Sequence, residues 1–276
     1  YLLKSFFIVQ KKLKHTAKAP IGIFDSGLGG LSICKEIMKL LPNESIIYLA
    51  DSKNAPYGEK SKDEIIELSI KNVELLLTLN CKAIVVACNT ATTNSITTLR
   101  KKYNLLFIGI EPAIKPAALQ TKTRKIGVLA TEGTLKSELF LSTSNQFRDS
   151  MEIIEVKGEN LVRCIESGDI NKTKPLLEKY LHPMVKAGVD NIVLGCTHYP
   201  FLIPLIKDIV PNHVVIIDSG EAVAKQTEVV LRNENALNND SESEESRFYT
   251  NKDLHIFKSF LNKINLSSDN AIYKNF

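Results

Sequence analysis

Two cysteines each follow a short apolar run, and this placement makes them the residues most suggestive of chemistry. Cys88 follows the run at 83–87, and Cys196 follows a similar run at 191–195, about 108 residues further along the chain. Short runs rich in β-branched residues are typical of strands buried on both faces of a parallel sheet. Open α/β sheets bind ligands just past the carboxyl ends of such strands. We therefore expect the two thiols to share one site assembled from two related halves.

A thiol is useful as an acid or base when its pKa is lowered or when a base stands beside it. Asp25 ends an earlier apolar run, and His198 lies two residues past Cys196. An aspartate in this place also suits a cap of the glycine-rich turn at 25–30, and a lone histidine is often an ordinary buried residue. Both residues are candidates to assist a thiol.

The polar residues beside these strand ends are neutral. Ser26, Asn89, Thr90 and Thr197 offer hydrogen-bond donors and acceptors that suit a small carboxylate or an amino acid. The turn at 25–30 lacks the Lys-Ser/Thr pair of a P-loop and does not match GxGxxG, which argues against a nucleotide. No His, Asp and Glu cluster has metal-ligand spacing, and no lysine has a pyridoxal-phosphate context. The sequence therefore predicts neither a metal nor a cofactor.

Composition excludes several classes of protein. The 276 residues include 35 basic and 31 acidic ones, a net charge of +4, and the basic residues are scattered, so we expect no nucleic-acid partner. No run of roughly 18 apolar residues predicts a membrane span. The odd number of cysteines and the absence of CxxC argue against a disulfide framework and a zinc knuckle. We expect Cys34, Cys81 and Cys164 to be buried hydrophobic residues, and free thiols indicate a reducing cytoplasm.

The elements that would position the cysteines form a repeat. Strands are expected at 20–25, 46–49, 83–87 and 106–110, and again at 125–130, 153–156, 191–195 and 214–217, with helices between them. Corresponding strands are offset by about 105 to 108 residues. Alternating strands and helices predict right-handed parallel βαβ units. The expected fold is α/β, with two pseudo-symmetric parallel-sheet domains and the active site in the cleft between them.

The division of the chain follows from this repeat. We expect an N-terminal extension over 1–19, a first α/β domain over 20–115, a second over 116–222, and a C-terminal segment over 223–276 that packs back on the first domain. The extension has no clear signal-peptide pattern. Within the C-terminal segment, the polar stretch 233–246 predicts a flexible loop, and 252–264 has helical apolar spacing.

Four stretches together resemble the signature motifs of the glutamate racemases. They are DSGLGG at 25–30, APYG at 55–58, ACNTA at 87–91 and GCTHYP at 195–200, and the likeness runs from about residue 20 to the end. Arg247-Phe248-Tyr249 adds to the resemblance. The sequence departs from it at Glu132-Gly133 and Gly158-Glu159, where many members have Pro-Ala and Cys-Pro.

The resemblance implies cofactor-independent interconversion of L- and D-glutamate, the D-isomer being destined for bacterial peptidoglycan. Cys88 and Cys196 would face opposite sides of the α-carbon, one removing a proton as thiolate and the other delivering one as thiol. Asp25 would assist Cys88, His198 would assist Cys196, and Glu166 matches the family's acidic residue near the second cysteine. The implied substrate contacts are Asp25, Ser26, Tyr57, Gly58, Asn89, Thr90, Thr131, Thr134, Thr197 and His198.

Three other interpretations stay open at this point. The first is a racemase of aspartate or another acidic amino acid, and the second is a non-catalytic amino-acid-binding α/β protein. The third is a hydrolase or decarboxylase that uses only one of the two thiols. The expected partner is glutamate as a small-molecule substrate. The sequence leaves the oligomeric state open, and a homodimer is one arrangement compatible with it.

Overall fold

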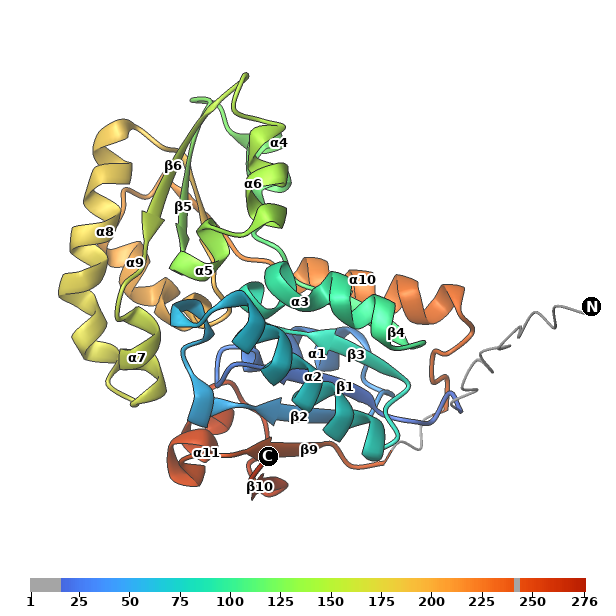
Figure 1. Cartoon of the computed structure of the whole chain (residues 1–276). Helices are drawn as coiled ribbons and strands as arrows, with labels where there is room; N and C mark the ends of the chain where they lie inside the picture. The colour runs from blue at the N-terminus through green and yellow to red at the C-terminus, as the bar shows by residue number, and fades with distance from the viewer. Residues whose placement is uncertain (1–15, 241–243) are drawn as a thin grey trace, which may run out of the picture.

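Two parallel sheets flanked by helices make up the chain in the computed structural model, which describes residues 16–240 and 244–276 (Figure 1). This confirms the α/β class. Most of the expected N-terminal extension lies outside the described residues. The strands are β1 (Ile21–Asp25), β2 (Ile46–Ala50), β3 (Ala83–Val86), β4 (Leu106–Gly109), β5 (Lys125–Ala130), β6 (Glu152–Lys157), β7 (Asn191–Gly195), β8 (Val215–Ile217), β9 (Arg247–Thr250) and β10 (Ala271–Tyr273).

The strand order repeats between the two sheets. The first sheet has the order β10-β9-β2-β1-β3-β4 and the second β6-β5-β7-β8, and every pairing is parallel. The four strands β2-β1-β3-β4 thus have the same arrangement as β6-β5-β7-β8, which confirms the predicted pseudo-symmetry. Because the order reverses beside β1 and β5, the carboxyl ends of β1, β3, β5 and β7 are where ligands bind in such sheets.

Helices cover both faces of each sheet. They are α1 (Leu31–Leu40), α2 (Lys62–Thr78), α3 (Asn89–Lys102), α4 (Ile114–Gln120), α5 (Glu132–Leu135), α6 (Glu138–Asn145), α7 (Leu161–Glu166), α8 (Lys174–Ala187), α9 (Ile203–Ile209), α10 (Gly220–Asn233) and α11 (Leu254–Lys263), with the 3-10 turns η1 (Ser52–Asn54), η2 (Tyr57–Glu59), η3 (Ile170–Thr173) and η4 (Tyr199–Leu202).

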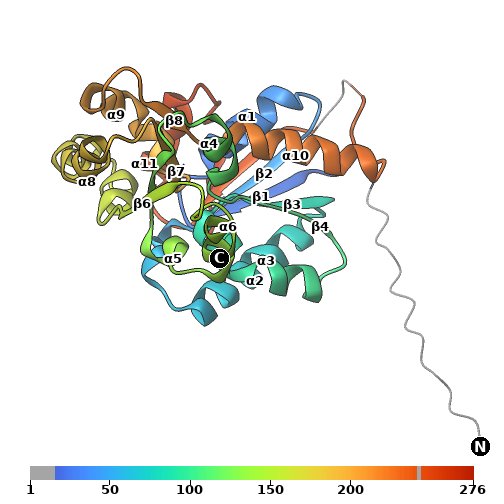
Figure 2. The same cartoon turned by 90° about the horizontal axis from the view of Figure 1, so that it is seen from above.

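Alternate residues of the buried strands face opposite helical layers. In β2, Ile46 and Tyr48 pack in one apolar cluster with residues of α1 and α10, whereas Ile47 and Leu49 pack in another with residues of α2 and α3. Figure 2 shows these two helix pairs on opposite sides of the first sheet. Burial on both faces explains why these strands are continuous apolar runs rather than alternating ones.

The chain crosses between the two sheets twice, and this defines two lobes. The first lobe contains residues 16–113, 220–240 and 244–276, and the second contains 114–219. The C-terminal elements complete the first lobe: α10 packs on α1, and β9 pairs with β2 in register, Tyr48 opposite Phe248. The sequence did not predict β10, since Ile272 and Tyr273 are exposed and no apolar pattern marks it.

Two short helices with a break between them follow β5: α5 ends at Leu135 and α6 starts at Glu138. Ser137 is the cause, because its hydroxyl accepts the backbone N–H of Phe140 and caps the new helix.

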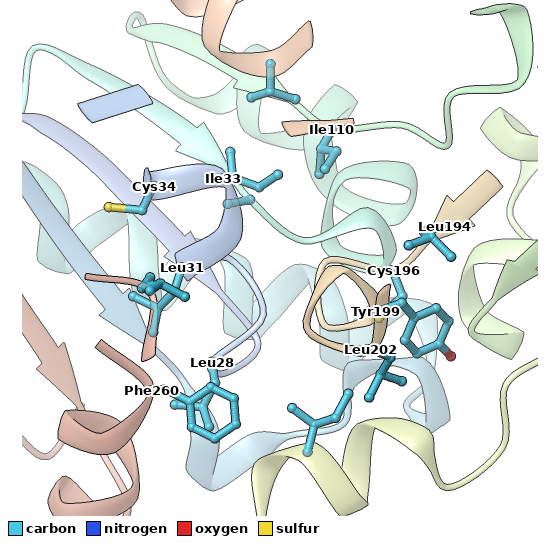
Figure 3. Close-up of a cluster of buried hydrophobic side chains, with 14 of the residues drawn as sticks. Leu28, Leu31, Ile33, Cys34, Ile110, Leu194, Cys196, Tyr199, Leu202 and Phe260 are labelled. Atoms are coloured by element: carbon cyan, nitrogen blue, oxygen red, sulfur yellow. The ribbon is translucent and has the colours of Figure 1, made fainter. Parts of the chain in front are cut away.

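A continuous apolar cluster joins the two lobes. Figure 3 shows Leu28, Leu31 and Phe260 of the first lobe in the same cluster as Tyr199 and Leu202 of the second.

Among the described residues, no helix is both long and apolar enough to cross a membrane. All five cysteines are free; Cys34 and Cys81 are buried as expected, but Cys164 is only half-buried.

Candidate active site

Both cysteines line one small cavity between the lobes. The empty space between its lining residues is about 250 Å³, part of which is open to solvent, so the pocket is narrow. The sequence-predicted residues that also line it are Ser26, Tyr57, Gly58, Asn89, Thr90, Thr131, Thr197 and His198.

Three predicted residues stand behind this lining. Asp25, Thr134 and Glu166 are buried and contact lining residues rather than the cavity itself. Two lining residues were not predicted as site residues. Pro56 belongs to the APYG stretch, which could have marked it, whereas Val162 has no distinguishing signal in the sequence.

Cys88 lies at the N-cap of α3, directly past β3. Its sulfur accepts the backbone N–H of Ala91 at 3.4 Å, and its thiol donates to Oγ of Ser26 at 3.6 Å. Burial and the nearby Asp25 carboxylate raise the pKa of the Cys88 thiol, while the hydrogen bonds with Ala91 and Ser26 oppose that shift. The first turn of a helix favours an anion, so this position partly offsets the burial of a thiolate.

Asp25 sits beneath Cys88 at the end of β1. Its carboxylate accepts the backbone N–H groups of Gly27 at 3.1 Å and Gly30 at 3.0 Å, and it also accepts the hydroxyl of Thr197 at 3.3 Å. Burial raises the pKa of Asp25, and the charge of His198 and the Gly30 hydrogen bond oppose that shift. The residue therefore caps the turn and interacts directly with the Cys88 thiol.

Cys196 has a different neighbour, the imidazole of His198. The sulfur lies 3.8 Å from Nδ1 of His198, and Nε2 of that ring lies 2.6 Å from Oε1 of Glu166. The three side chains form a chain of contacts from carboxylate to imidazole to thiol, all within the second lobe. A carboxylate behind an imidazole orients the ring and stabilises its protonated form.

The protonated ring is the favoured form here. Burial lowers the pKa of His198, but its contacts with Cys196 and Glu166 outweigh burial and raise that pKa well above its ordinary value. The backbone N–H of Gly29 also lies 3.2 Å from Nε2. The 2.6 Å contact with a carboxylate is the stronger one, so we assign the Nε2 proton to the bond with Glu166.

The glycine-rich turn of the first lobe supports this pair across the cleft. The backbone N–H of Leu28 donates to Oε1 of Glu166 at 2.6 Å, over a separation of 138 residues. A Cβ at Gly27 would collide with the Glu166 carboxylate, and one at Gly29 would collide with the His198 ring. The two glycines are therefore required for close approach of the lobes.

Polar groups of both lobes meet at the pocket. The Thr90 hydroxyl lies 2.8 Å from that of Thr131 and 3.2 Å from that of Thr134, which joins the first lobe to the second. Asn89 is buried, yet neither its amide nitrogen nor its oxygen has a partner in the protein. Because buried polar groups are normally paired, an unpaired amide lining a cavity points to a polar ligand.

These contacts define what the site can do chemically. Two buried thiols share one cavity, one beside a carboxylate and the other beside an imidazolium, with neutral hydrogen-bonding groups around them. Such a site can remove a proton from a small polar molecule and return one. Within residues 16–240 and 244–276, no group of three His, Cys, Asp or Glu residues could hold a metal ion.

Comparison with known proteins gives consistent matches. A family model described as Asp/Glu/Hydantoin racemase matches residues 21–227. The chain is 47% identical over 220 residues to the glutamate racemase of Ectopseudomonas mendocina, covering 79% of this chain and 84% of that protein. It is 44% identical over 254 residues to the glutamate racemase of Pseudomonas entomophila, covering 91% and 96%.

A solved structure has the same fold over nearly the whole chain. It is Escherichia coli glutamate racemase in complex with L-glutamate and the activator UDP-MurNAc-ala. The TM-score is 0.82 at 30% sequence identity, covering 93% of this chain and 98% of that one.

Proposed function

Because the chain belongs to the glutamate racemases of the Asp/Glu/hydantoin racemase family, we propose that it interconverts L- and D-glutamate by direct proton transfer at the α-carbon. One observation carries the mechanism: two free cysteines, from equivalent positions of the two pseudo-symmetric sheets, line one cavity. The reaction needs no cofactor, since the two thiols supply both the base and the acid.

The proton balance is simple. In one direction the Cys196 thiolate takes the α-proton, so the Cα–H bond breaks, an S–H bond forms and the electron pair stays on the α-carbon. The Cys88 thiol then gives its proton to the opposite face, which inverts the centre and leaves Cys88 as thiolate. The reverse reaction exchanges these roles, so the two thiols alternate between acid and base.

The partners of each thiol suit this exchange. His198, held by Glu166, stabilises a thiolate at Cys196 as an ion pair and can return the proton when Cys196 is to act as an acid. Cys88 has the α3 N-terminus and Ser26 for its thiolate, and Asp25 favours its thiol form. Since the α-proton of an amino acid is very weakly acidic, the developing negative charge depends on such preorganised groups in a site that excludes water.

Substrate recognition falls to the neutral residues of the pocket. The unpaired Asn89 amide offers a donor and an acceptor, and the hydroxyls of Ser26, Thr90 and Thr197 offer more. Such groups bind carboxylates and an ammonium group without adding a net charge. We assign to Asn89 a direct contact with glutamate.

Deuterium exchange tests this function directly. In D₂O the purified protein should racemise L- and D-glutamate with incorporation of solvent deuterium at the α-carbon, and Cys88→Ser and Cys196→Ser should each abolish racemisation. A binding protein would show no incorporation, and a hydrolase or decarboxylase would need only one cysteine. Turnover of aspartate but not glutamate would refute the substrate assignment.

The reaction suggests a place in the cell. We infer that the product D-glutamate supplies peptidoglycan synthesis, and hence cell shape, and that the protein works in the cytoplasm, because its thiols must stay reduced. Depletion of the protein should then create a requirement for D-glutamate. A homodimer stays a prediction that sedimentation of the purified chain would test.

A further inference from the structure

We propose that Asn251, in the C-terminal part of the first lobe, is a positioning residue for this reaction. Through Asp51 it holds Tyr57, and with Tyr57 the wall of the pocket beside Cys88. The inference rests on the proposed function. It gives a role in the reaction to Asn251 and Asp51, neither of which lines the cavity.

Asp51 is the centre of the network. It is 2% exposed and directly follows β2. One carboxylate oxygen accepts hydrogen bonds from the side-chain amides of Asn251 at 2.5 Å and Asn54 at 2.8 Å, and the other accepts the Tyr57 hydroxyl at 2.6 Å. Burial raises the pKa of Asp51, and the hydrogen bonds from Tyr57 and Asn251 oppose that shift.

Asn251 holds the same loop at two points. Its amide nitrogen donates to Asp51, while its amide oxygen accepts the backbone N–H of Lys53 at 2.8 Å. The register explains how residues 200 positions apart meet: Ala50 pairs with Thr250 at the ends of β2 and β9, so Asp51 and Asn251 emerge side by side. Asn251 is itself 2% exposed, so water cannot readily replace these bonds.

Tyr57 transmits the constraint to the site. Its hydroxyl donates to Asp51 and accepts the side-chain amide of Asn72 at 3.1 Å, and neither partner lines the cavity. Tyr57 itself lines the cavity and packs in the apolar cluster that contains Cys88. The next residue, Gly58, also lines the cavity. The network therefore fixes an apolar wall against one of the two thiols.

This placement predicts an unequal effect on the two proton transfers. Loosening Tyr57 should slow the transfer that involves Cys88 and leave the one at Cys196 intact. The two enantiomers have equal free energies, so kcat/KM must stay equal in both directions, and steady-state rates alone cannot show the difference. Primary deuterium isotope effects can show which transfer has slowed, because each enantiomer is deprotonated by a different cysteine.

The test compares Asn251→Ala with Asn262→Ala, which removes an exposed asparagine on α11. We expect Asn251→Ala to lower kcat/KM for glutamate by at least about tenfold, because it removes the charge-assisted bond to Asp51 and also the bond from the Lys53 N–H. The isotope effects measured with the two α-deuterated enantiomers should move in opposite directions. Asn251→Asp, which keeps the shape but removes the donor to Asp51, should be at least as impaired. Asn262→Ala should match the wild type.

A double-mutant cycle with Tyr57→Phe tests whether Asn251 acts through the Tyr57 hydroxyl. That variant lacks the hydroxyl that joins the ring to Asp51, so Asn251→Ala should cost much less activity in its background. Fully multiplicative effects, a wild-type kcat/KM in Asn251→Ala, or a reduced kcat/KM with unchanged isotope effects would each overturn the proposal. Absence of racemisation in the wild-type protein would instead refute the proposed function.

Discussion

The pair formed by His198 and Glu166 gives the sharpest quantitative prediction. Glu166→Gln keeps the size of the side chain and removes its charge. The carboxylate is buried, and Oε1 accepts both Nε2–H of His198 and the backbone N–H of Leu28, each at 2.6 Å. An amide oxygen can keep both bonds, so the substitution isolates the contribution of the charge.

The magnitude follows from the bond that is weakened. A hydrogen bond to a charged group contributes roughly 1.5–3 kcal/mol and a neutral one roughly 0.5–1.5 kcal/mol, so the charge itself accounts for about 1–1.5 kcal/mol. Because the site is buried, solvent does not screen this contribution. The pKa of His198 should therefore fall in the variant towards its ordinary value. The thiolate of Cys196 loses the same stabilisation, so kcat/KM near neutral pH should fall about tenfold.

The direction of the pH dependence is fixed by the raised pKa of His198. In the wild type the imidazolium persists well above pH 6.5, whereas in Glu166→Gln it should lose its proton at lower pH. The basic limb of the kcat/KM profile should therefore shift to lower pH. A histidine with a raised native pKa stabilises the fold fully below its unfolded pKa and loses that contribution as pH rises through the native pKa. The stability deficit of the variant should accordingly be largest in mild acid and vanish at high pH.

Three measurements check this prediction. NMR titration of the His198 ring reports its pKa, steady-state racemisation reports kcat/KM against pH, and urea unfolding at several pH values reports stability. Glu159→Gln, an exposed carboxylate in the same lobe, is the matched control and should behave as the wild type. An unchanged His198 pKa, together with kcat/KM within about twofold of the wild type, would refute the role given to Glu166.

Three further substitutions test other contacts. Gly29→Ala puts a Cβ 2.7 Å from the backbone nitrogen of His198. The resulting overpacking costs roughly 1–3 kcal/mol and should reduce kcat/KM about ten- to a hundredfold. Unchanged kinetics would contradict the close packing of the lobes. Asn89→Ala removes an amide without protein partners, so KM for glutamate should rise about tenfold while the unfolding free energy stays the same or increases; a large loss of stability would contradict this assignment. Lys82→Met leaves Glu44 buried without its 2.5 Å ion pair, and urea unfolding should show a loss of about 3–5 kcal/mol with kcat of the folded enzyme preserved; a loss below about 1 kcal/mol would contradict the cost assigned to breaking this buried pair.

The regular part of the fold could be predicted from the sequence for a physical reason. Strands covered on both faces must be apolar at every position, so the runs before Cys88 and Cys196 stand out, and the equal offsets reveal the repeat. The strand ends then place each thiol at the carboxyl edge of its own sheet. The sequence did not predict strand β10, because its place in the sheet depends on pairing with β9 and not on an apolar pattern of its own.

Contacts between the lobes could not be predicted in this way. The glycines at 27 and 29 suggest a tight turn, but nothing in their spacing names Glu166 or His198 as the groups they admit. Glu166 entered the site only through family resemblance, since an acidic residue in a short helix has many ordinary explanations. Asn251 had no signal at all: its partner is 200 residues away and is specified only by the register of β9 on β2.

The same contacts explain why a symmetric scaffold holds an asymmetric site. The sheets place Cys88 and Cys196 equivalently, yet the turn at 25–30 reaches from the first lobe to the partners of Cys196: the Leu28 N–H donates to Glu166, and Gly29 leaves room for the His198 ring. Cys88 relies on groups within its own lobe, Ser26 and the first turn of α3, together with the wall held by Asn251. Separation of the lobes would therefore disturb the imidazolium that serves Cys196 before it disturbs Cys88. If so, perturbations of the lobe interface such as Gly29→Ala should shift the two deuterium isotope effects in the opposite sense to Asn251→Ala, and a shift in the same sense would contradict this division between the thiols.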